Sequence, residues 1–267
     1  MQDNEVVVPR GLPKANPVLG TPRELRDFAP LLKWLLVNLL LVIVLIVLWD
    51  LGLVQIVLAT DRTRVSLIIA GIFVLTVLHC LYQTWITSRD LVVARRVRDK
   101  VAETDNVPVQ LADGRVMVGG AVLEPGILTT HIANLIRKAG MSSMAGFDQT
   151  VLLRSLADRL RTREKLGLFV SESLLRLALL GTALGFILML IPLSALTSFD
   201  TETLRTALTA MTSGMAIALN VTVTGIGCAL ILKFEYYLLD GAIAELFEIT
   251  TETTEVGIIP RIGKIDG

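Results

Sequence analysis

Residues 167–196 read GLFVSESLLRLALLGTALGFILMLIPLSAL, and this stretch decides the fold because it is apolar at all but a few positions. The hydrocarbon core of a bilayer is about 30 Å thick, and a helix of about 20 mostly apolar residues crosses it. Three other stretches meet this requirement, residues 31–49, 65–87 and 212–232. The sequence therefore predicts a protein that crosses a membrane with four helices.

The composition favours the same fold class, an all-α membrane protein. Hydrophobic residues make up 53% of the chain, against about 45–50% in a typical soluble domain. The net charge is zero, so nothing points to nucleic acid as a partner. Five parts are predicted: a cytoplasmic N-terminal tail (1–30), a peripheral transmembrane hairpin (31–87), a cytoplasmic domain (88–166), a second transmembrane hairpin (167–233), and a cytoplasmic helix and tail (234–267).

Positive charges near the ends of the spans predict the orientation, because the cytoplasmic ends of membrane helices carry an excess of Lys and Arg. They cluster before the first span, after the second and before the third: Arg10, Lys14, Arg23, Arg26, Lys33, Arg89, Arg95, Arg96, Arg98, Lys100, Arg159, Arg161, Arg163 and Lys165. The other two loops carry only Arg62, Arg64 and Arg205, beside acidic residues. Both termini and the central loop are therefore expected to face the cytoplasm.

The segments outside the spans also show regular patterns. Residues 107–118 alternate around Asp113-Gly114, which is typical of a β-hairpin, and residues 127–138 have helical spacing that Gly140 could end. Helical spacing from Thr150 runs into the third span, and the period of the fourth span continues beyond it. Both helices are predicted to extend into the cytoplasm. In the last one, five acidic residues are predicted on faces other than the apolar one: Glu235, Glu245, Glu248, Glu252 and Glu255.

The four spans differ in composition. The first two consist mainly of Leu, Val and Ile, which is typical of lipid-facing helices, and the apolar residues 51–59 are expected to prolong the first. The third and fourth spans carry small residues at helical spacing, each with a central threonine. These residues are Ala178, Gly181, Thr182 and Gly185 in the third span, and Gly214, Ala218, Thr222, Gly225 and Ala229 in the fourth.

Two interpretations fit these small residues. Because they let another backbone approach closely, either the two spans pack on each other or they receive a helix of another protein. Thr182 and Thr222 leave a similar choice, since a threonine hydroxyl in a helix often bonds the carbonyl one turn back.

The sequence contains no recognisable catalytic or metal-binding constellation. A Gly-rich phosphate loop, zinc-ligand spacing and a nucleophile triad are all missing, so we expect no enzyme activity and no cofactor. His79 in the second span is either a proton relay or a packing residue, and His131 has no metal-ligand companions. Acidic residues are missing from the cores of the spans. Glu172 and Arg176, at the cytoplasmic mouth of the third, are spaced to pair.

Two motifs resemble those of the MotA/TolQ/ExbB proton-channel family. The first is similar to its Leu-Gly-Thr-Val-x-Gly motif and reads Leu180-Gly181-Thr182-Ala183-Leu184-Gly185. The second resembles its Ala-Leu-x-x-Thr-x-x-Gly-Leu motif with the preceding glycine, and reads Gly214-Met215-Ala216-x-Ala218-Leu219-x-x-Thr222-x-x-Gly225-Ile226. Two prolines frequent in the family are absent next to these motifs. The four-span topology is closer to MotA than to three-span members.

The resemblance implies the pore-forming subunit of an ion-driven rotary motor in the bacterial inner membrane. Such subunits form a pentamer around a dimer of a single-span partner, of the MotB, TolR or ExbD type, which supplies the ion-binding aspartate. Thr182 and Thr222 would lend hydroxyls to the ion, and the small residues would line the pore and pack along the partner helix. The expected ion is H⁺, with Na⁺ as the alternative. The alternative function is a non-conducting membrane scaffold that recruits partners through its cytoplasmic helices.

Overall fold

The computed structural model describes residues 29–55, 64–104, 106–111, 114–140, 148–194 and 201–262. Four long helices dominate this part of the chain: α2 (Ala29–Asp50), α4 (Val65–Glu103), α6 (Thr150–Ser194) and α7 (Thr201–Glu252). Each contains a segment that is long and apolar enough to cross a membrane. The prediction of a helical, multi-pass membrane protein is therefore confirmed, while the orientation of the termini stays a prediction.

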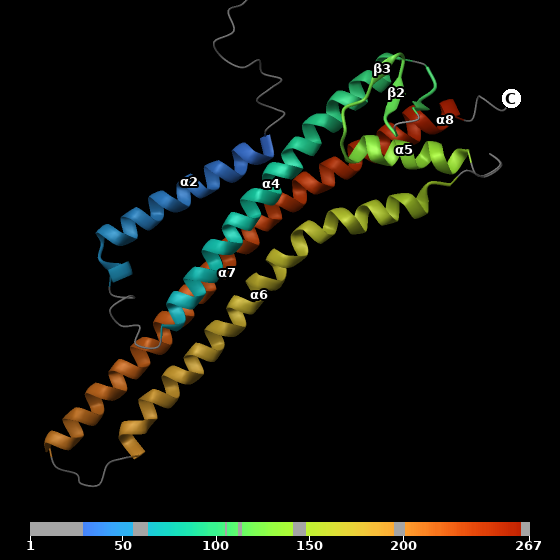
Figure 1. Ribbon diagram of the computed structural model, residues 1–267. Helices are drawn as coiled ribbons and strands as arrows, with labels where there is room; N and C mark the ends of the chain where they lie inside the picture. The colour runs from blue at the N-terminus through green and yellow to red at the C-terminus, as the bar shows by residue number, and fades with distance from the viewer. Residues whose placement is uncertain are drawn as a thin grey trace, which may run out of the picture.

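The helices α4, α6 and α7 lie side by side along the length of the molecule (Figure 1). The structure confirms that α6 is continuous from Thr150 to Ser194, and α7 likewise continues well beyond the fourth predicted span. The Asp148 carboxylate accepts the backbone N–H of Thr150 at 2.8 Å, which caps the start of α6. This hydrogen bonding also lowers the pKa of the Asp148 carboxyl.

Helix α2 is the least packed of the four. Trp34 is its only buried residue within the described chain, and α2 diverges from α4 toward its C-terminal end (Figure 1). The expected prolongation through residues 51–59 is wrong for the described residues, because α2 ends at Asp50 and Gly52 adopts φ +76°. Glycine reaches this left-handed conformation without strain, so the chain turns there. Residues 56–59 lie outside the described part of the chain.

Helix α4 differs from the expectation of a wholly lipid-facing span. One of its faces is buried, and it packs on α7. This face carries small side chains four residues apart, namely Thr76, Cys80, Thr84 and Ser88, all at most 4% exposed. In the sequence these four positions stand among many Leu, Val and Ile residues. Their spacing by four is the helical signal that would have indicated a buried face.

A small domain lies between α4 and α6. The strands β1 (Val109–Gln110) and β2 (Val116–Val118) pair antiparallel, which confirms the predicted hairpin. Asp113 lies outside the described residues. A third strand, β3 (Ala121–Val122), was not predicted, and it adds a small sheet to the expected all-α fold. Helix α5 (Ile127–Ala139) ends at Gly140 as predicted, and its Leu128 and Ile132 pack with Val116 in the hydrophobic core.

The C-terminal part of the described chain returns to this domain. Helix α7 passes into the π-helix η1 (Thr253–Ile258) and then into α8 (Ile259–Ile262). The Arg261 guanidinium donates to the backbone carbonyl of Thr104, just after α4. This contact joins α8 to the end of α4.

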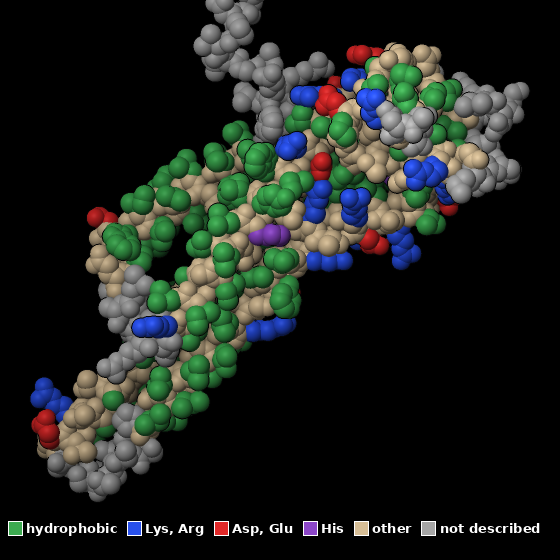
Figure 2. Space-filling view, viewed as in Figure 1, with side chains coloured by type: hydrophobic (Ala, Val, Ile, Leu, Met, Phe, Trp, Pro, Cys, Tyr) green, Lys and Arg blue, Asp and Glu red, His purple; other side chains and the backbone are tan. Residues whose placement is uncertain are grey.

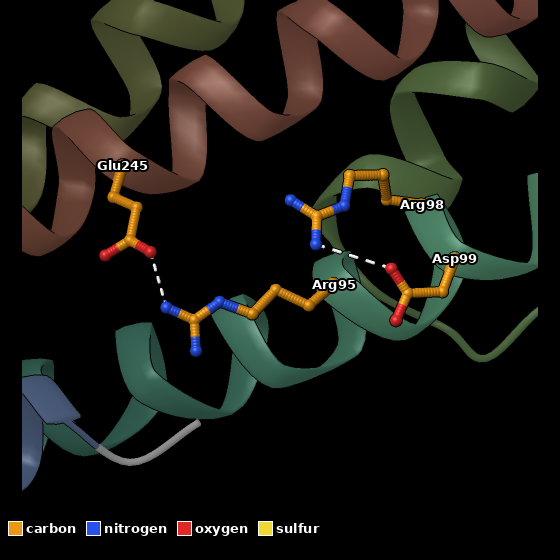
Figure 3. A network of polar contacts seen from close by, with 4 residues as sticks. All are labelled: Arg95, Arg98, Asp99 and Glu245. Carbon is orange, nitrogen blue, oxygen red and sulfur yellow. Dashed lines mark hydrogen bonds and ion pairs between the residues drawn. The ribbon is translucent and has the colours of Figure 1, made fainter. Parts of the chain in front are cut away.

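Charged side chains gather at the end of the molecule that holds α5 and the sheet, whereas hydrophobic side chains cover the helices beyond it (Figure 2). Ion pairs join the helices at the charged end: Arg95 of α4 pairs with Glu245 of α7 (Figure 3). The Arg163 guanidinium of α6 lies 2.7 Å from Asp90 of α4 and donates to Thr87 at 2.9 Å. Both partners of the Arg163–Asp90 pair are only about one-fifth exposed, which makes it less screened than a surface pair.

Candidate ion-pathway site

The small residues of α6 and α7 face each other, and we call this contact the α6–α7 seam. A Cβ atom built on Gly185 would lie 2.8 Å from the Ala218 backbone, and one built on Gly225 would lie 2.4 Å from the Ala178 Cβ. Real Cβ atoms are not found so close to other atoms. The two backbones therefore touch at levels where only glycine fits.

The same packing continues along the α6–α7 seam in both directions. A Cβ atom on Gly214 would lie 2.8 Å from the Met189 backbone, and one on Gly181 would lie 2.3 Å from Val221 Cγ1. Ala229 is buried in a cluster with Leu174 of α6. The interpretation that the two spans pack on each other is confirmed. The further role of these residues against a partner helix stays a prediction.

The hydroxyls of the two threonines bond within their own helices. Thr182 Oγ1 donates to the Leu179 carbonyl at 2.6 Å, and Thr222 Oγ1 donates to the Ala218 carbonyl at 3.0 Å. Both side chains are half-buried. A hydroxyl has one donor and two acceptor lone pairs, so each oxygen keeps acceptor capacity for a cation or a water molecule.

A shallow groove of about 450 Å³ runs beside the α6–α7 seam. Its lining is apolar except for one hydroxyl and consists of Thr182, Ala183, Phe186, Met189, Met215 and Ala218. Thr222 is not among the lining residues. The structure thus opens Thr182 to a surface groove, and it does not bring both predicted threonines into that groove.

His79 has hydrogen-bonding partners, and the predicted ion pair is formed. His79 Nδ1 lies 2.8 Å from Tyr236 Oη, and its Nε2 lies 3.3 Å from Gln83 Nε2, so His79 joins α4 to α7. Glu172 and Arg176 pair at 3.5 Å, as expected. No cluster of three or more His, Cys, Asp or Glu side chains suited to a metal ion occurs among the described residues.

One acidic residue differs from its prediction. Glu235 of α7 is fully buried, although its side chain was expected on a polar face. It follows Leu232 by three positions and precedes Leu239 by four, and both leucines are fully or almost fully buried. This helical spacing places Glu235 on the buried face, and it is the signal by which the sequence could have revealed it.

Comparisons of the chain with family models, with curated proteins and with solved structures gave no match. The resemblance to the MotA/TolQ/ExbB family therefore rests on the two sequence motifs of the third and fourth spans. It supports a proposal about function, and no family is assigned to the chain.

Proposed function

We propose that this chain is the pore-forming subunit of an ion-driven rotary motor, which surrounds a single-span partner and converts ion motive force into mechanical work. The observation that carries the proposal is the placement of the two motifs. They lie on consecutive helices, and their glycines meet in the α6–α7 seam. A hairpin of this kind offers a rigid wall against which another helix can move.

The chemistry of the spans favours a partner that supplies the ion-binding group. The apolar cores of residues 31–49, 65–87 and 212–232 contain no Asp or Glu, and Glu172 of the third span is paired with Arg176. Conduction of H⁺ through such a wall requires a carboxylate from elsewhere. The acceptor lone pairs of Thr182 and Thr222 suit a cation or the hydrogens of water, and the same holds for Na⁺.

The partner can be sought directly. Purification of the tagged chain from its native membrane in mild detergent is expected to recover a second protein with one membrane span and one aspartate in it. Native mass spectrometry should then show more copies of this chain than of the partner, a pentamer around a dimer. Recovery of the chain alone, as a monomer, in several detergents and in native nanodiscs would contradict the proposal.

A specific observation also favours the second candidate, a non-conducting scaffold. Both threonine hydroxyls already use their donor within their own helices, so a packing role accounts for them without any ion. The double substitution Thr182→Val and Thr222→Val separates the two functions. A motor should lose ion flux while it keeps its assembly, whereas a scaffold should keep its full function.

The chain offers a matched control for that experiment. Thr206 lies on α7, is exposed, and bonds the Glu202 carbonyl at 3.0 Å in the same i to i−4 geometry as Thr222. Thr206→Val therefore removes the same group from the same helix outside the predicted ion path. Equal loss of flux in the control and in the double variant would exclude a specific role of Thr182 and Thr222.

A further inference from the structure

A buried carboxyl group lies where α2, α4 and α7 meet. Glu235 is 0% exposed, and neither carboxyl oxygen has a hydrogen-bond partner among the described residues. No salt bridge reaches it within the same part of the chain. An ionised carboxylate buried without a partner is strongly disfavoured. Glu235 therefore requires either a neutral, protonated state or a ligand that carries positive charge.

The surroundings distinguish these two choices. The polar groups that face the carboxyl are Trp34 and Asn38 of α2 and Cys80 of α4, and we call these residues with Glu235 the Glu235 cluster. The indole N–H of Trp34 likewise makes no hydrogen bond with described residues. An indole N–H and a thiol offer no oxygen ligands, so beside the carboxyl itself only the amide carbonyl of Asn38 could supply one, whereas hard metal cations bind through about six to eight oxygens. The cluster thus suits a proton rather than a metal cation.

The other titratable groups nearby do not provide a counter-charge. Cys80 of α4 is buried, and a thiol carries no positive charge in either protonation state. Tyr236 follows Glu235 on α7, and its hydroxyl is engaged by His79. Helix α2 contributes only the uncharged Trp34 and Asn38, and α6 approaches at Gly167, which meets the Tyr236 ring. The carboxyl is thus the only acid of the cluster that ionises at ordinary pH.

The position of the cluster gives its charge a structural consequence. Trp34 is the only buried residue of α2 within the described chain, and it faces Glu235. Beyond this contact α2 diverges from α4 (Figure 1). The one buried side chain of α2 among the described residues, Trp34, therefore faces a carboxyl group that can gain or lose a proton.

We propose that Glu235 is a proton-binding site, and that its protonation holds α2 against α4 and α7 through Trp34. With the proton bound, the neutral carboxyl lies beside the indole of Trp34 at no cost in buried charge. Loss of the proton leaves a buried negative charge, so water enters the cluster and Trp34 is released. This inference does not depend on the motor proposal, because it needs neither a partner protein nor ion conduction.

The test uses the fluorescence of Trp34 in the full chain in lipid nanodiscs. Trp49 and Trp85 are both 54% exposed, so Trp49→Phe and Trp85→Phe leave Trp34 as the single reporter. The chain is titrated from about pH 5 to about pH 9, a range that covers the raised pKa values known for buried carboxyls. We expect the Trp34 emission to shift to the red in one transition as the pH rises.

Substitutions decide which group causes the transition. Glu235→Gln, which stays neutral, should abolish the transition and keep the blue emission at every pH, whereas Cys80→Ser should leave the transition in place. Persistence of the transition in Glu235→Gln, its loss in Cys80→Ser, or its absence from the parent would overturn the proposal. If Glu235→Gln does not fold, Glu235→Asp serves instead. Its carboxyl should move the midpoint, and an unchanged midpoint would count against Glu235.

Discussion

The α6–α7 seam and the Glu235 cluster are two ways in which helices of one protein hold together. In the α6–α7 seam, glycine and alanine bring two backbones into contact, and the threonine hydroxyls are satisfied within their own helices. In the Glu235 cluster, a large aromatic side chain anchors α2, and polar groups are buried without partners among the described residues. The comparison teaches that the first contact depends on shape, whereas the second depends on the charge state of one group.

The largest effect is expected from filling the α6–α7 seam. Gly185→Leu would place side-chain atoms where the Ala218 backbone already lies. A backbone cannot rotate away as a side chain can, so the loss should exceed the about 1–3 kcal/mol typical of overpacking. Unfolding of the purified chain in increasing denaturant, followed by circular dichroism, measures it.

Gly227 provides the matched control for this substitution. It lies on α7, and a Cβ atom built there meets nothing within 4 Å. Gly227→Leu should therefore change the unfolding midpoint little. If both leucine variants were equally destabilised, the close backbone contact would not be the cause.

The next effect is expected from the anchor of the Glu235 cluster. Trp34→Ala removes the only buried side chain of α2 among the described residues, and core Trp→Ala changes cost about 3–5 kcal/mol. Here the expected result is local: α2 becomes accessible to protease while α4, α6 and α7 stay folded. Trp49→Ala, at an exposed position of the same helix, should leave the cleavage pattern unchanged.

A smaller effect is expected from the ion pair between α4 and α6. Arg163→Ala leaves Asp90 and Thr87 without their partner in a half-buried site, at an expected cost of about 1–3 kcal/mol. A double-mutant cycle with Asp90→Ala isolates the pair. The exposed Arg98–Asp99 pair (Figure 3) is the comparison, and its cycle should give a coupling near zero. Equal couplings for both pairs would show that burial does not matter here.

The smallest effect is expected from His131, in the small domain between α4 and α6. Burial lowers the pKa of His131, against the opposing hydrogen bond to Gln149. The unfolded chain then binds a proton more readily than the folded domain, so stability is complete above the ordinary value of about 6.5 and falls as the pH drops below it. The thermal midpoint of the parent should decrease on acidification more than that of His131→Gln. Parallel pH profiles for both proteins would contradict this assignment.

The sequence predicted most of the helical fold because membrane solubility imposes simple constraints on length and composition. The spans, the start of α6 at Thr150 and the end of α5 at Gly140 follow from local patterns. The two candidate threonines were found by motif, and their bonds to carbonyls one turn back follow the usual behaviour of threonine in a helix, whereas the groove beside Thr182 depends on how two helices pack. Glu235 was assigned to the wrong face because a charged residue next to a span was expected to reach water.

The sequence by itself determined that this chain has four apolar helices and that the last two carry small residues on one face, since both properties are periodic and local. Only the tertiary structure decided what those faces contact. It placed the glycines of α6 and α7 against each other, brought α4 onto α7, and enclosed Glu235 between three helices. Burial and pairing depend on residues far apart in the chain, and a local pattern cannot specify the distance between them.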